Sequence, residues 1–100
     1  MNYQFNLGDM KVLKEVNLEG AIPTTLKQAF TGNVALERIK GVPDLSQLTV
    51  LDFGNLCYNN NSLEDIEDMR NWDLSKITHL GNAFNRCYAL KDITPIKCIT

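Results

Sequence analysis

Residues 26–39, LKQAFTGNVALERI, and residues 80–93, LGNAFNRCYALKDI, decide the fold of this chain because the second stretch repeats the pattern of the first. Both contain an Ala-Phe pair, a leucine six residues after the phenylalanine, and an isoleucine three residues later. The corresponding positions are Ala29 and Ala83, Phe30 and Phe84, Asn33 and Cys87, Leu36 and Leu90, and Ile39 and Ile93. In residue number, every one of these pairs shows the same shift of 54, which is twice 27. Self-similarity at a fixed period of this order is typical of a repeat protein.

The leucine pattern occurs at four places along the chain. A leucine is followed three residues later by a branched apolar residue at Leu13 and Val16, Leu36 and Ile39, Leu63 and Ile66, and Leu90 and Ile93. In residue number, successive leucines are shifted by 23, 27 and 27. One such unit cannot enclose a core alone, so stacked units are expected to align their leucines in one buried row and their valine and isoleucines in a second. We predict a single domain over residues 1–100, with units at 13–35, 36–62 and 63–89, a partial unit at 90–100, and an N-terminal cap strand at 1–12.

The middle unit fits the pattern less well than its neighbours. The Cys-Tyr pair at 57–58 matches the pair at 87–88 with a shift of 30, and the Asp-Leu-Ser run at 44–46 matches 73–75 with a shift of 29. We therefore predict a small insertion at 59–62, with residues 53–56 in the place of Phe30. The segments KQAF and HLGNAF are predicted to form short helical turns.

The repeat units resemble a known family. Residues 13–39 resemble the BspA-type leucine-rich repeat, whose units run leucine-x-x-isoleucine, Ile-Pro, a leucine, Ala-Phe and a further leucine; here Val16 takes the place of the first isoleucine. Residues 69–93 are similar to related repeats of bacterial surface proteins and lipoproteins, through Trp-Asp-x-Ser and Phe-x-x-Cys-x-x-Leu. The resemblance implies an α/β repeat: a short leucine-rich-repeat solenoid with a small parallel sheet and short helical or irregular turns on its other face. It also implies adhesion or protein recognition, with no catalytic residues.

Composition narrows the classes of partner. The chain has a formal net charge of −2 and scattered cations, so a nucleic-acid backbone is not an expected ligand. No apolar run approaches the roughly 20 residues that span a bilayer. The start of the chain lacks the pattern of a secretion signal, which favours a cytoplasmic protein if the chain is complete and a cell-surface protein if it is a fragment. The three cysteines have no zinc-type spacing, and buried thiols in a reducing compartment are the simplest interpretation.

Few residues have the pattern of a chemical site. The run Glu64-Asp65-Ile66-Glu67-Asp68 lacks the spaced oxygen ligands and glycine turn of a calcium loop. We therefore interpret it first as a solvated surface, second as a partner-binding patch and last as a metal site. His79 is the single histidine and has no nucleophile at a motif spacing. Trp72 is either an interface anchor or a packing residue. We expect no metal, no cofactor and no enzyme activity.

The candidate binding residues lie on the outer face of the expected sheet. Side chains beside a buried strand position point outward, so the three residues around each ladder position form columns across the units. The resulting partner-binding candidates are Glu15, Glu37, Arg38, Glu64, Asp65, Glu67 and Asp92. This mainly acidic face suits a protein of complementary charge, although any repeat sheet needs solvated residues at these positions.

Three settings are compatible with a protein-recognition function. The chain is interpreted first as a small inhibitor or immunity-type protein of a phage or mobile element. The alternatives are a fragment of a bacterial adhesin-like surface protein and a structural segment that associates with itself through its C-terminal edge, where the last unit has no following neighbour.

Overall fold

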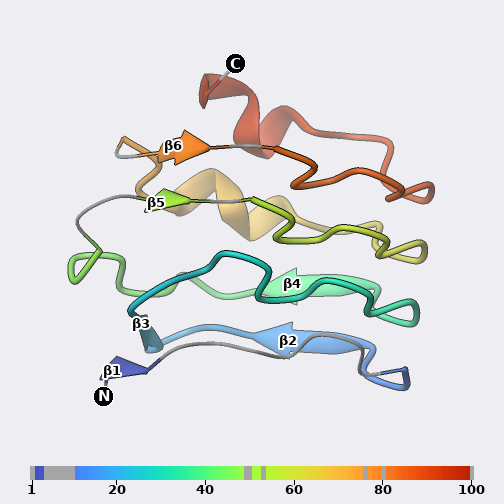
Figure 1. The fold of residues 1–100 in the computed structure, drawn as a ribbon, viewed down its shortest axis with the longest axis horizontal. Coiled ribbons are helices and arrows are strands. Elements are labelled where there is room, and N and C mark those ends of the chain that lie inside the picture. Colours follow the sequence, from blue (N-terminus) through green and yellow to red (C-terminus); the bar gives the residue numbers. More distant parts are fainter. Residues whose placement is uncertain are drawn as a thin grey trace.

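The computed structural model describes residues 2–3, 11–48, 51–52, 54–75, 77–79 and 81–99. The elements in chain order are β1 (Asn2–Tyr3), β2 (Glu15–Asn17), β3 (Ile22–Pro23), β4 (Arg38–Lys40), β5 (Leu51–Asp52), the 3-10 helix η1 (Glu67–Asn71), β6 (Ile77–His79) and the 3-10 helix η2 (Thr94–Ile99). Figure 1 shows the chain running back and forth in successive passes that lie one above another, with the two termini at opposite ends. The extents are 30 × 28 × 21 Å.

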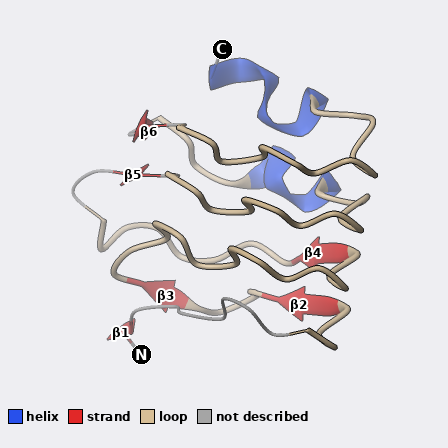
Figure 2. Cartoon of the chain, turned by 45° about the vertical axis from the view of Figure 1, so that its right-hand side comes forward, coloured by secondary structure: helices blue, strands red, loops and turns tan. Residues whose placement is uncertain are grey.

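Neighbouring passes are joined by parallel strand pairs. β2 pairs with β4, with Glu15 opposite Arg38 and Val16 opposite Ile39, and Arg38 forms an isolated parallel bridge with Asp65. The shift in residue number from Glu15 to Arg38 equals that between the leucines at 13 and 36. The shift from Arg38 to Asp65 equals that between the leucines at 36 and 63. β1 pairs with β3, and β5 pairs with β6 across an irregular register at Leu51 and Asp52. Figure 2 shows β2 and β4 along one side of the molecule, and β5 and β6 along another.

A second ladder of backbone hydrogen bonds joins three turns at residues 27–32, 54–59 and 81–86. The amides of Gln28, Phe30 and Gly32 donate to the carbonyls of residues 54, 56 and 58 over 2.8–2.9 Å. The amides of residues 55, 57 and 59 donate to those of 81, 83 and 85 over 2.7–2.9 Å. The difference in residue number between donor and acceptor is the same in all six bonds, so the register does not change between the two steps.

This constant register corrects the prediction of an insertion at 59–62. In a parallel ladder an amide bonds to the residue before its partner, so Phe30, Cys57 and Phe84 share one column and Asn33, Asn60 and Cys87 share another. The match of Cys57 to Cys87, on which the predicted insertion depended, is therefore wrong, because the two cysteines occupy different columns. Residue 53, which was expected near the place of Phe30, lies outside the described residues.

The expected helical turns at KQAF and HLGNAF are also corrected. KQAF forms a hydrogen-bonded turn. In HLGNAF the described residues are the last residue of β6 and a turn at 81–84. Gln28, Asn55 and Asn82 occupy one column and have φ values of 59°, 55° and 58°. A left-handed backbone at that position stops a right-handed helix, which explains why turns form there instead. The two helices of the described chain lie after the ladder isoleucine Ile66 and after Ile93.

The core lies between the ladders. Its fully buried side chains include Leu18, Leu26, Phe30, Leu36, Ile39, Leu56, Leu63, Ile66 and Met69, and Asn33 is buried among them. The expected isoleucine row does not reach its fourth member, because Ile93 is 52% exposed and Ile96 of η2 is buried instead. Of the expected cap strand, residues 2–3 pair with β3, whereas Phe5 and Leu7 lie outside the described residues. No helix among the described residues is long and apolar enough to cross a membrane.

Candidate partner-binding face

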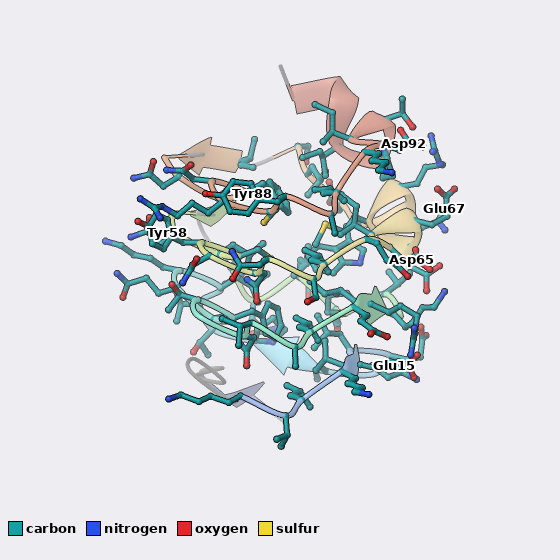
Figure 3. All side chains as sticks on the ribbon, turned by 90° about the vertical axis from the view of Figure 1, so that its right-hand side faces the viewer. Glu15, Tyr58, Asp65, Glu67, Tyr88 and Asp92 are labelled. Carbon is teal, nitrogen blue, oxygen red and sulfur yellow. The ribbon has the colours of Figure 1, made fainter. Side chains whose placement is uncertain are left out.

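The structure brings the seven predicted residues to one side of the stack. Glu15 lies on β2, Arg38 on β4 and Asp65 on the bridge beside β4, so the ladder register sets these three side by side. Glu37 and Glu64 precede them, and the Glu64 amide donates to the Glu37 carbonyl over 3.0 Å. Figure 3 shows Glu15, Asp65, Glu67 and Asp92 along the same side of the molecule. We call the seven residues the sheet face, although Glu67 begins η1 and Asp92 precedes η2.

Ion pairs between neighbouring passes occupy much of the sheet face. Arg38 Nε donates to Glu15 Oε1 at 2.8 Å and its Nη1 donates to Glu37 Oε1 at 3.1 Å. Lys40 Nζ lies 3.0 Å from Asp65 Oδ2. The hydrogen bond to Glu15, followed by the charges of both glutamates, raises the pKa of Arg38. These pairs are partly exposed, so each adds little stability, but they leave fewer acidic charges for a partner.

Two of the predicted binding residues have a local structural role. Asp65 Oδ1 accepts the Glu67 amide at 3.0 Å, and Asp92 Oδ1 accepts the amide and the hydroxyl of Thr94 at 2.9 and 2.7 Å. The Glu67 amide, and then Lys40, lower the pKa of Asp65, while the Thr94 hydroxyl and amide lower that of Asp92. Asp65 thus accepts a hydrogen bond from the first amide of η1, and Asp92 from the first amide of η2.

Arg70, which pairs with Glu67, connects the two helices to each other. The Glu67 carboxylate accepts Arg70 Nε at 2.8 Å, and Arg70 Nη2 also donates to the Thr94 hydroxyl at 3.1 Å. Asp68 Oδ2 accepts the Gly41 amide at 2.7 Å. Within the acidic run, Asp65 and Asp68 thus contact the segment of β4 directly, and Glu67 acts through Arg70. Within the described ranges, no group of three metal-ligating side chains gathers.

Glu64 differs from the other acidic residues of the sheet face. It is exposed, and its carboxylate forms no hydrogen bond or ion pair with any residue that the structure describes. The ladder register places Lys14 and Glu37 in its column, because Glu15 lies opposite Arg38 and Arg38 lies opposite Asp65, and these three residues directly follow Lys14, Glu37 and Glu64. Glu64 is therefore the carboxylate of the sheet face that is most available to a partner.

The remaining candidates have mainly structural environments. Trp72 is buried and its Nε1 donates to the Gly41 carbonyl at 3.0 Å, which fits the packing interpretation. Burial raises the pKa of Cys57 and raises that of Cys87 to about 11, so both thiols remain protonated at neutral pH. The side chains of His79 and Cys98 lie outside the described part. No pocket occurs over the described residues.

Sequence reasoning overlooked the surface of the three turns. Tyr88 is 72% exposed, Val34 is 39% exposed and Tyr58 is half-buried. Figure 3 shows Tyr58 and Tyr88 near each other, on a part of the surface away from Glu15 and Asp65. The ladder register sets Tyr88 in the column of Val34 and residue 61, and sets Tyr58 in the column of Thr31 and Asn85.

Comparisons with protein-family models, curated proteins and solved structures found no match to this chain. Neither the family models nor the curated proteins therefore point to an enzyme activity.

Proposed function

We propose that the chain is a protein-recognition module with the architecture of a short leucine-rich-repeat solenoid. The parallel ladders, whose register follows the spacing of the leucines, support this architecture. Stacked passes of this kind hold side chains of successive units about 4.8 Å apart on a rigid surface. A rigid, open, polar surface is suited to binding another macromolecule.

The observation that carries the proposal is the order of the sheet face. Arg38 and Lys40 each reach across to an acidic residue of a neighbouring pass, at 2.8 and 3.0 Å. These pairs hold charged side chains in place around Glu64, whose carboxylate has no partner in the described part of the chain. This order lowers the entropy that a partner must remove on binding. In this proposal a protein with a cationic group opposite Glu64 binds the sheet face.

The acidic balance of the chain suits a compact inhibitor or immunity-type protein of a phage or mobile element. A surface-exposed adhesin-like protein would use the same face, and the two settings differ only in the partner. Self-association is the weaker alternative, because Ile96 of η2 is buried against the last pass.

The proposal is tested with two variants that add positive charge at different places. The chain is screened against a displayed library of folded protein domains, and the affinity of the selected binders is measured for each variant. Glu64→Lys is expected to weaken the binders by about tenfold, which corresponds to about 1.4 kcal/mol. Gln47→Lys, at an exposed position outside the sheet face, is expected to leave affinity unchanged. Equal affinity of both variants for every binder would rule out the sheet face as the contact.

A further inference from the structure

The three turns form a second surface with a composition unlike that of the sheet face. We call residues 27–35, 54–62 and 81–89 the turn face. None of the 12 acidic residues of the chain lies in these ranges, whereas Lys27 and Arg86 do. Seven asparagines lie there, and Asn33 and Asn60 are the two that are buried. Tyrosine, asparagine, serine, glycine and arginine are the residues that antibody binding loops favour, and acidic residues and lysine are depleted at interface cores.

Arg86 occupies a backbone conformation that glycine adopts more easily. Its φ is 65°, and the equivalent residues of the two preceding turns are Gly32 at 75° and Asn59 at 64°. A left-handed conformation is costly for a residue with a Cβ and a long side chain, and such strain tends to be kept where the side chain has a function. The presence of glycine in the same column shows that the turn does not need an arginine to form.

The guanidinium of Arg86 has no partner among the residues that the structure describes. Arg38 pairs with Glu15 and Glu37, and Arg70 pairs with Glu67. Arg86 is exposed and its side chain makes no ion pair or hydrogen bond with any residue in the described ranges, although its carbonyl accepts Asn61 Nδ2 at 3.0 Å. Arg86 is thus the one arginine of the chain that forms no ion pair with a described residue.

Two tyrosines stand close to Arg86 on the turn face. The amide of Asn59, next to Tyr58, donates to the carbonyl of Asn85, next to Arg86, over 2.9 Å. Tyr88 follows Arg86 by two residues and is 72% exposed. Figure 3 shows both tyrosines on this part of the molecule. Arginine and tyrosine are among the residue types that most often carry binding energy at protein interfaces.

We propose that the turn face binds an acidic protein segment, with Arg86 bound to a carboxylate and Tyr88 and Tyr58 in contact with the apolar residues beside it. Charge complementarity supports this occupant, because the turn face has cations and no carboxylate that would repel an acidic segment. A guanidinium matches a carboxylate through two parallel hydrogen bonds, which a lysine cannot reproduce. The inference rests on the proposed recognition function but assigns it a second surface and an opposite charge preference.

A displayed library of random dodecapeptides, panned on the whole chain, supplies the probe. Selected peptides are expected to be rich in Asp or Glu next to aromatic or aliphatic residues. Arg86→Gly is expected to weaken the best peptide at least tenfold without loss of folding, since glycine is already accepted at position 32. Arg86→Lys is expected to weaken it by a similar factor, and Tyr88→Ala by about fivefold.

Two controls separate this inference from simpler explanations. Gln47→Gly removes an exposed side chain outside the turn face and is expected to leave peptide affinity unchanged. Glu64→Lys is expected to leave it unchanged as well, since that residue belongs to the sheet face. Selected peptides without acidic residues, or equal affinity of Arg86→Gly and the unaltered chain, would overturn the inference. Peptides that lose affinity only with Glu64→Lys would overturn it while supporting the proposed function.

Discussion

At the scale of single residues, the carbonyl oxygen of Phe30 connects two neighbouring turns. It accepts the Nδ2 of Asn33 at 2.7 Å and the Nδ2 of Asn60 at 3.0 Å, and both asparagines are fully buried. In the third turn Cys87 occupies the same column, and its Sγ donates to the Cys57 carbonyl at 3.1 Å. A buried side-chain donor in this column therefore satisfies a turn carbonyl that water cannot reach.

Replacement of Asn33 tests this role. Asn33→Ala leaves a buried carbonyl with one donor fewer, and we expect the free energy of unfolding to fall by about 1–3 kcal/mol. Urea denaturation monitored by circular dichroism measures the change. Asn71→Ala, at an exposed position in η1, is the control and is expected to stay within about 0.5 kcal/mol of the unaltered chain. Equal losses for the two variants would mean that the column of buried donors does not stabilise the turns.

Residue types in the sequence indicate some of these positions and conceal others. Asn33 and Cys87 match at a shift of 54, so a small buried side chain could be expected at both. Asn60 stands among four polar residues and looked like part of a solvated insertion, because burial depends on the register of the neighbouring turns. The roles of Asp65 and Asp92 were missed because an outward-facing carboxylate and a capping carboxylate have the same sequence pattern.

At the scale of elements, β4 ends where the backbone makes a close approach to the preceding pass. Gly41 has a φ of 85°, its amide donates to Asp68 and its carbonyl accepts Trp72 Nε1. A Cβ at this position would meet the Asn17 side chain and would lie 2.5 Å from the Glu19 nitrogen. Gly20, at the end of the preceding pass, has a similar φ of 79° but has nothing within 4 Å of its Cβ position.

The two glycines make a matched pair of alanine substitutions. Gly20→Ala is expected to lower the free energy of unfolding by about 1 kcal/mol, from the left-handed backbone alone. Gly41→Ala adds the steric conflict, and we expect a further loss of about 1–3 kcal/mol. Thermal denaturation of both proteins gives the comparison. A Gly41→Ala protein as stable as Gly20→Ala would show that the neighbouring backbone moves away without cost.

The 3-10 helix η1 explains why corresponding segments of two successive units differ in their number of residues. Asp73 lies seven residues after Ile66, whereas Asp44 lies five after Ile39, and η1 takes up the difference. Further on, Asn82 lies nine residues after Asp73, whereas Asn55 lies 11 after Asp44, so the original register returns. A period can be read from the sequence, but the place where a unit gains and loses residues is set by how the neighbouring passes pack.

At the scale of the whole molecule, a short 3-10 helix covers the C-terminal end of the stack. η2 packs on η1 at the C-terminal end, with Ile96 buried and the Ile96 amide bonded to the Ile93 carbonyl at 3.0 Å. The sequence predicted an unprotected edge there, because the last unit has no following neighbour to cover it. A short 3-10 helix after Asp92 is enough to place one apolar side chain over the last pass.

A substitution that displaces η2 tests whether the chain associates with itself through its C-terminal end. Ile96→Asp puts a carboxylate into a buried site, and we expect a loss of about 2–5 kcal/mol in the free energy of unfolding and release of η2. The last pass would then expose apolar side chains and backbone groups, so the variant is expected to associate at high concentration, as measured by light scattering. The unaltered chain and the exposed control Lys91→Asp are expected to remain monomeric. An Ile96→Asp protein that loses stability but stays monomeric would remove the support for self-association through this end. A self-associating unaltered chain would instead show that η2 does not protect it, and would favour the structural alternative over the recognition module.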